Sequence, residues 1–138
     1  MKSLKNLIRV QQWKLDEKRR VVSDMEGLLE GFRAEITRLD EERLREQEIA
    51  VQDPILGASF GAYATAARTR RENLLSSIAE SERQLVTARE ELAELFQELK
   101  RYEITEETRL TQLKQSRDKM MQEEMDELSI ELHRRKNR

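Results

Sequence analysis

The 138-residue chain is 39% charged and only 4% aromatic, with a formal net charge of −2. This composition is typical of coiled coils and long helices, and its near balance of charge argues against a nucleic-acid binder that works by neutralising phosphates. No run approaches the ~20 apolar residues of a membrane span, and a chain without cysteine can form no disulfide.

The first expected element is a helix over residues 2–51. Its apolar residues recur in steps that mostly alternate between four and three, the pattern of two-stranded helix packing. We call this stripe the seam; in the first helix it comprises Leu4, Ile8, Leu15, Val22, Met25, Leu29, Phe32, Ile36 and Leu39. Polar residues also occupy seam positions, namely Gln11, Lys18, Arg43 and Glu46. The seam is therefore expected to be imperfect at both ends.

A turn is expected over residues 52–59, which hold the only proline of the chain. Pro54 lacks an N–H group and cannot continue a helix interior. Gly57 offers access to positive φ, and Ser59 is a good N-cap for a following helix. Asp53 followed by Pro54 is a second possible start, so the second helix can begin anywhere from 54 to 60.

The second helix is expected over residues 60–134 and is the longer one. Its seam comprises Phe60, Ala64, Ala67, Leu74, Ile78, Leu85, Ala88, Leu92, Leu95, Leu99 and Tyr102. Folding back at the turn makes an all-α antiparallel coiled-coil hairpin, in which Leu4 should lie opposite a residue near 107 because both helices rise ~1.5 Å per residue. The residues beyond about 108 then lack a partner in the chain.

This expected extension still carries apolar residues, but in a shifted register that includes consecutive steps of four. They are Leu110, Leu113, Met121, Met125, Leu128 and Leu132. Isolated helices are marginal in water, so an uncovered stripe predicts a protein partner.

A second apolar set, Leu7, Val10 and Trp13, lies off the seam near the N-terminus. Aromatic residues are enriched at interface hot spots, so the set is either a docking surface or a contact with the early part of the extension. Both chain ends are basic: residues 1–20 carry a net charge of +5 and residues 129–138 a net charge of +3. This end of the hairpin is expected to meet acidic groups on a partner.

The sequence offers no candidate catalytic centre, cofactor site or metal site, so we expect a protein that is not an enzyme. Its single histidine, His133, lies close to a basic terminus and is expected to be solvated. Gly57 and Gly61 are not followed by the Gly-Lys-Ser/Thr ending of a phosphate-binding loop.

Over nearly its full length the chain resembles the FliJ family of flagellar type III export proteins, which are small coiled-coil hairpins similar in shape to the γ subunit of ATP synthases. Three motifs carry the resemblance. They are the leucine-and-arginine start (Leu4, Leu7, Arg9), the glycine-then-aromatic opening of the second helix (Gly57, Phe60, Tyr63, then Leu74 and Ile78) and the acidic closing segment 123–128.

The resemblance implies a non-enzymatic cytoplasmic stalk, peripheral to the inner membrane at the flagellar base. Such a stalk binds the centre of a hexameric export ATPase, promotes its assembly and activity, contacts the cytoplasmic domain of the export gate and escorts export chaperones. On this chain the ATPase-binding end would comprise Leu4, Leu7, Ile8, Arg9, Trp13, Met125, Asp126, Leu128 and Leu132. Phe60 and Tyr63 would contact the gate, unless they only plug the closed end of the hairpin. The alternative function is a homo-oligomeric coiled-coil scaffold or tether.

Overall fold

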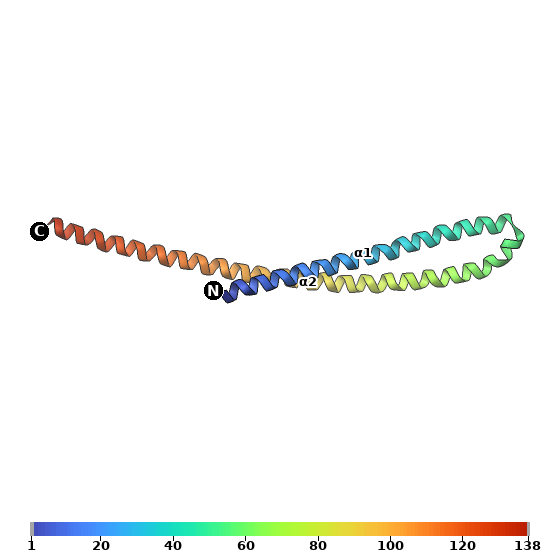
Figure 1. The fold of residues 1–138 in the computed structure, drawn as a ribbon, viewed down its shortest axis with the longest axis horizontal. Coiled ribbons are helices and arrows are strands. Elements are labelled where there is room, and N and C mark those ends of the chain that lie inside the picture. The colour runs from blue at the N-terminus through green and yellow to red at the C-terminus, as the bar shows by residue number, and fades with distance from the viewer. Residues whose placement is uncertain (1, 138) are drawn as a thin grey trace. The chain divides into compact units, whose positions relative to one another are not determined.

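A computed structural model describes residues 2–137 and contains two helices over that range, α1 (Lys2–Gln52) and α2 (Pro54–Lys136) (Figure 1). The helices pack against each other as an antiparallel hairpin with the second helix longer, which confirms the expected fold class. Their contacts divide the chain into two compact units. The turn unit is Lys14–Glu94, and the terminal unit is Met1–Trp13 with Leu95–Arg138.

Ion pairs between α1 and α2 define the antiparallel direction within the turn unit. Lys18 pairs with Glu91, and Asp40 pairs with Arg71, so the partner's number falls as the α1 residue number rises. Glu26–Arg89 and Arg33–Glu82 follow the same order, and Glu35 pairs with Arg70, the neighbour of Arg71 on α2. Exposed pairs of this kind contribute roughly 0–1 kcal/mol each, so they select the register more than they stabilise the hairpin.

The core of the turn unit is the predicted seam. Val22 and Leu29 of α1 are buried in one cluster with Leu85 and Ala88 of α2. The flanking residues Met25, Ile78 and Leu92 pack against this cluster. Burial of an aliphatic side chain stabilises by ~1.5–3 kcal/mol, so these few layers hold the two helices together. The alternating three- and four-residue steps therefore did predict the buried face.

The turn is shorter than the expected 52–59, because the single residue Asp53 separates the two helices. The Asp53 side chain caps α2 by accepting a hydrogen bond from the Ile55 N–H at 3.0 Å, and Pro54 takes the first helical position. Ser59 lies inside α2, where its hydroxyl donates to the Leu56 carbonyl instead of capping a helix.

The role of Gly57 in this turn differs from the positive φ that the sequence predicted. No described residue has positive φ. Instead, the Gly57 N–H donates to the Asp53 carbonyl at 2.8 Å, and the missing side chain lets this turn of helix approach the backbone of Ala50. Glycine is needed here for close approach, not for a left-handed conformation.

Within the terminal unit, the start of α1 pairs with α2 up to residue 109. Leu4 and Ile8 are half-buried, while Gln11 and Leu99 are buried. The Gln11 side chain is only 6% exposed, and its Oε1 has no hydrogen-bond partner among the described residues. From Leu110 to Asn137 every residue of the chain is exposed. Ile8 of α1 still lies beside Leu110, Thr111 and Lys114. Among the described residues, the predicted lack of a partner in the chain therefore holds for the part of α2 beyond Lys114.

Candidate interaction surface

The exposed part of α2 beyond residue 109 presents an apolar stripe. We call it the extension stripe, and it consists of Leu110, Leu113, Met121, Met125, Leu128 and Leu132, all exposed. At 100° per residue these six side chains fall within an arc of about 120° on the helix surface. Ile130, which is equally exposed, lies on the opposite face. An amphipathic helix of this kind normally buries its apolar face against another element.

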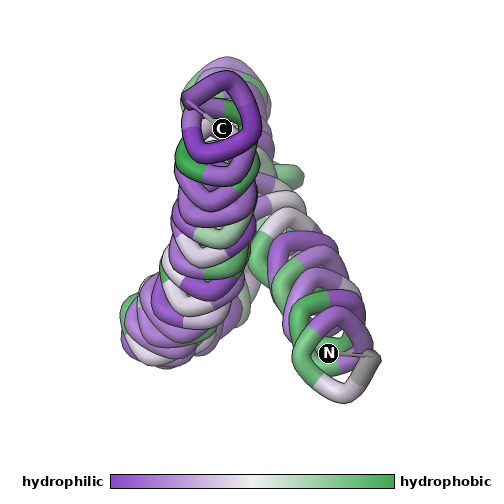
Figure 2. The backbone as a smooth tube through the Cα atoms, turned by 90° about the vertical axis from the view of Figure 1, so that its left-hand side faces the viewer, coloured by the Kyte–Doolittle hydropathy of each residue, from purple (hydrophilic) through white to green (hydrophobic). Residues whose placement is uncertain are grey.

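The N-terminal apolar set is also uncovered. Leu7 and Val10 are nearly half exposed, and Trp13 is 63% exposed. Contact with the early part of the extension, the alternative left open by the sequence, does not bury them. Figure 2 looks toward the two chain ends, and hydrophobic positions recur in green along both tubes in the foreground.

The structure does not bring together the two halves of the expected ATPase-binding end. Ile8 lies beside Leu110, and Met125 follows Leu110 by 15 residues. At ~1.5 Å per residue, this places Met125 roughly 22 Å farther along α2. Leu128 and Leu132 lie beyond it, and Asp126 and Arg9 are exposed. The candidate surface is therefore two separate apolar faces, one on α1 and one on the extension.

A groove of about 420 Å³ lies where α1 begins on α2. We call it the Ile8 groove; it is lined by Ile8, Glu103, Glu106, Glu107, Leu110, Thr111 and Lys114. Its rim carries three carboxylates, so it suits a ligand with an apolar centre and basic edges. This groove is not predicted by the seam pattern, although the acidic segment 103–107 opposite Leu4 indicates a polar rim at this end of the helix pair.

Glu106 is the most enclosed carboxylate of this groove. Its oxygens accept hydrogen bonds from Arg109 Nε at 3.2 Å and from Arg109 Nη2 at 2.8 Å. This hydrogen bonding, followed by the positive charge of Arg109, holds the pKa of Glu106 below its ordinary value against the opposing effect of burial. Glu106 therefore stays ionised at neutral pH in a seam position.

The residues expected to contact an export gate, Phe60 and Tyr63, lie in the first turns of α2 in the turn unit. Both are half-buried, and their ring centroids are 6.1 Å apart with the planes at 34°. Desolvation, followed by the nearby carboxylates of Glu42 and Glu46, raises the pKa of the Tyr63 phenol. Both rings are thus partly enclosed by the hairpin, an arrangement that favours the plug interpretation over a free aromatic patch.

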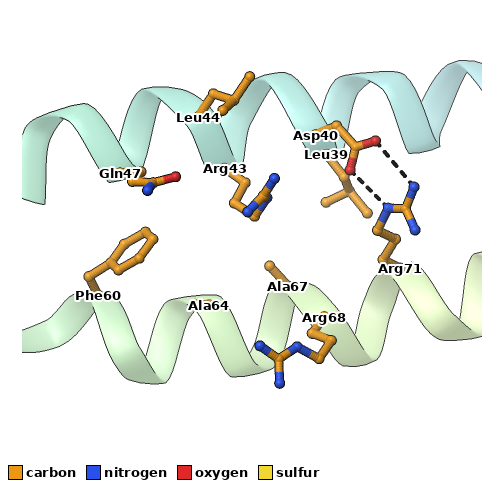
Figure 3. A pocket seen from close by; sticks show the side chains of 10 residues that line it. All are labelled: Leu39, Asp40, Arg43, Leu44, Gln47, Phe60, Ala64, Ala67, Arg68 and Arg71. Carbon is orange, nitrogen blue, oxygen red and sulfur yellow. Dashed lines mark hydrogen bonds and ion pairs between the residues drawn. The ribbon is translucent and has the colours of Figure 1, made fainter.

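Beside Phe60 the seam opens into a cavity of about 520 Å³ (Figure 3). Small side chains of α2, Ala64 and Ala67, lie across from the longer polar side chains of Arg43 and Gln47 (Figure 3). Arg43 and Glu46 were expected in the seam, yet both are exposed.

At the end of this cavity away from Phe60, Arg71 pairs with Asp40 (Figure 3). Arg71 Nε donates to Asp40 Oδ1 at 2.9 Å, and Nη2 donates to Oδ2 at 3.4 Å.

His133 is exposed, and its ring nitrogen Nε2 lies 3.0 Å from the side-chain nitrogen of Asn137. Among the described residues, no group of three or more His, Cys, Asp or Glu side chains is arranged to hold a metal ion. Over the same residues, neither helix has an apolar stretch long enough to cross a lipid bilayer.

Comparison of the chain with protein-family models, with characterised proteins and with solved structures finds no match.

Proposed function

We propose that this protein is a non-enzymatic component of a bacterial flagellar type III export apparatus. It acts as a coiled-coil stalk that binds the centre of a hexameric export ATPase, promotes its assembly and activity, and links it to the export gate. It also escorts export chaperones. Its place is cytoplasmic, peripheral to the inner membrane at the flagellar base.

The observation that carries the proposal is the extension stripe. From Leu110 to Lys136 the chain is helical and exposed, with six apolar residues on one face. A helix without tertiary contacts is marginal in water, and large exposed apolar faces mark interaction sites. A ring with a central opening can cover such a helix on several sides at once.

The N-terminal face supports the same proposal. Trp13, Leu7 and Val10 are exposed on the terminal unit, which also contains the extension. Tryptophan in an exposed apolar set is a typical anchor of a protein interface. The FliJ-like motifs of the sequence assign residues of both faces to the ATPase. For the gate contact, support rests only on the resemblance at Phe60 and Tyr63.

The test is ATP hydrolysis by the export ATPase with and without the full chain. One variant carries Leu7→Glu and Trp13→Glu, and a second carries Met125→Glu and Leu128→Glu. These side chains are all exposed, so the hairpin should fold normally in both variants. The matched control is Val51→Glu, which alters an 81% exposed residue at the other end of α1.

We expect the unchanged chain and the Val51→Glu control to stimulate hydrolysis, and both double variants to lose most of the stimulation. Unchanged hydrolysis with the wild-type chain, in a mixture where the ring assembles, would contradict the proposal. That outcome would favour the alternative function, a homo-oligomeric scaffold or tether, which requires no ATPase.

A further inference from the structure

The first and last residues of the extension stripe are placed symmetrically about Met121. Leu110 and Leu132 lie eleven residues on either side of it, and Arg117 and Met125 lie four residues on either side. Eleven-residue spacing keeps side chains on one face of an almost straight helix. A second copy of this helix, running in the opposite direction about Met121, would therefore place Met121 against Met121 and Leu110 against Leu132. Leu113, Met125 and Leu128 would lie opposite Ser129, Arg117 and Lys114.

The charges of the extension are arranged to fit the same pairing. Segment 114–119 contains three basic residues and one acidic residue, and segment 123–128 contains four acidic residues and no basic one. The two segments are equally distant from Met121. In an antiparallel pair the basic segment of each copy lies opposite the acidic segment of the other copy. The two-fold symmetry makes this contact occur twice.

A parallel pair would have the opposite result. It would place segment 123–128 against its own acidic copy and the basic residues Arg134, Arg135 and Lys136 against themselves. Repulsion between like charges along a helix pair selects against that orientation. The order of charges along the extension thus favours a second copy as the partner and the antiparallel over the parallel direction.

The Ile8 groove marks where the second helix would end. It shares Leu110 with the stripe, and the partner of Leu110 in the antiparallel pair is Leu132 of the second copy. The basic residues after Leu132 then reach the acidic rim formed by Glu103 and Glu107. The aliphatic stems of Lys114 and Arg117 can cover the partner's Leu128 and Met125 while their charged ends reach the neighbouring carboxylates.

We propose that two copies of this chain form an antiparallel dimer through the extension stripe, with a two-fold axis at Met121 and with Leu132 of each copy at the Ile8 groove of the other. The dimer covers the stripe that the proposed function assigns to the ATPase, so the ATPase and the second copy compete for it. The dimer itself does not depend on that function.

The test uses single cysteines, because the natural chain has none. Met121→Cys places two thiols at the axis, where a disulfide can form because the Cα atoms need to be only ~4.4–6.8 Å apart. Leu110→Cys and Leu132→Cys, each alone, place identical residues roughly 33 Å apart along the pair. Ile130→Cys, on the opposite face, is the matched control.

Under mild oxidation we expect Met121→Cys to give a covalent dimer. Leu110→Cys, Leu132→Cys and Ile130→Cys alone should stay monomeric, whereas a mixture of Leu110→Cys and Leu132→Cys chains should cross-link. Cross-linking of Leu132→Cys to itself as efficiently as Met121→Cys would overturn the antiparallel arrangement. Absence of cross-linking at Met121→Cys would overturn the dimer.

Sedimentation equilibrium of the wild-type chain gives a second measurement. We expect the mass to rise with concentration toward twice the monomer, and Met121→Lys to weaken the dimer by about tenfold or more because it places two like charges at the axis. Ile130→Lys should leave the dissociation constant unchanged. A monomer mass at every concentration would overturn the proposal. Neither experiment contains the ATPase, so its outcome is separate from that of the proposed function.

Discussion

A Cβ atom at Gly57 would lie 2.8 Å from the carbonyl oxygen of Ala50. The atom it would meet belongs to the backbone of α1 and cannot rotate away as a flexible side chain would. The one-residue turn at Asp53 thus depends on the absence of a side chain four residues later. Gly61, one helical turn farther on, has nothing within 4 Å of the same position.

Gly57→Ala should therefore destabilise the hairpin, by about 1–3 kcal/mol as for other overpacked sites, and lower the melting temperature by several degrees. The control is Gly61→Ala, which adds the same methyl group to the same helix in open space. It should raise stability by about 0.5–1 kcal/mol because alanine favours helix. Thermal melts followed by circular dichroism measure both, and equal effects of the two substitutions would contradict the close approach.

Lys18→Leu should raise the melting temperature. Lys18 occupies a half-buried seam position next to the Val22 cluster and pairs with Glu91. The ion pair contributes at most about 1 kcal/mol, whereas a leucine in a helix seam adds ~1.5–3 kcal/mol when fully buried. Lys14→Leu, at an exposed position, is the matched control and should have little effect. A fall in the melting temperature of Lys18→Leu would show that the ion pair outweighs the packing.

Stability should fall on acidification partly through Glu35. The hydrogen bond from Arg38, followed by the charges of Arg38 and Arg70, holds the pKa of Glu35 below its ordinary value. A carboxyl whose pKa is lower in the folded state stabilises that state above its unfolded pKa and loses the contribution as pH falls through the folded pKa. Melting temperatures measured from pH 7 down to about pH 3 should therefore decrease less for Glu35→Gln than for the wild-type chain.

The exposed Glu48 provides the control for this measurement. Glu48→Gln should preserve the wild-type decrease in melting temperature, because it leaves the Glu35 ion pairs intact. Parallel curves for Glu35→Gln and the wild-type chain would show that Glu35 is not linked to folding.

Amide hydrogen exchange should divide α2 at residue 109. The amides between Leu85 and Leu99 lie among buried seam residues and should exchange slowly. Those from Leu110 to Lys136 belong to an exposed part of α2 and should exchange orders of magnitude faster in dilute solution. Equal protection on both sides in dilute protein would contradict an unpaired extension. Protection that grows with concentration would follow from the proposed dimer.

The buried helix faces, the end of helix pairing and the extension stripe could be predicted from the sequence alone. Alternating steps of three and four predicted the buried faces around Val22, Leu29 and Leu85, since helix periodicity determines which side chains share a face. Pro54 marks the turn, and both helices rise by the same distance per residue. The length of the first helix therefore predicted that pairing ends near residue 108 of the second. The extension stripe followed from the same arithmetic, because it depends only on helix geometry.

Other features were decided by tertiary structure alone. The close approach of Gly57 to the Ala50 carbonyl is a packing distance that no local preference encodes. The Ile8 groove, the cavity beside Phe60 and the enclosure of Tyr63 likewise arise where side chains from the two helices meet. Periodicity is a property of one helix, whereas cavities and close approaches belong to the pair, so only the paired structure could place them.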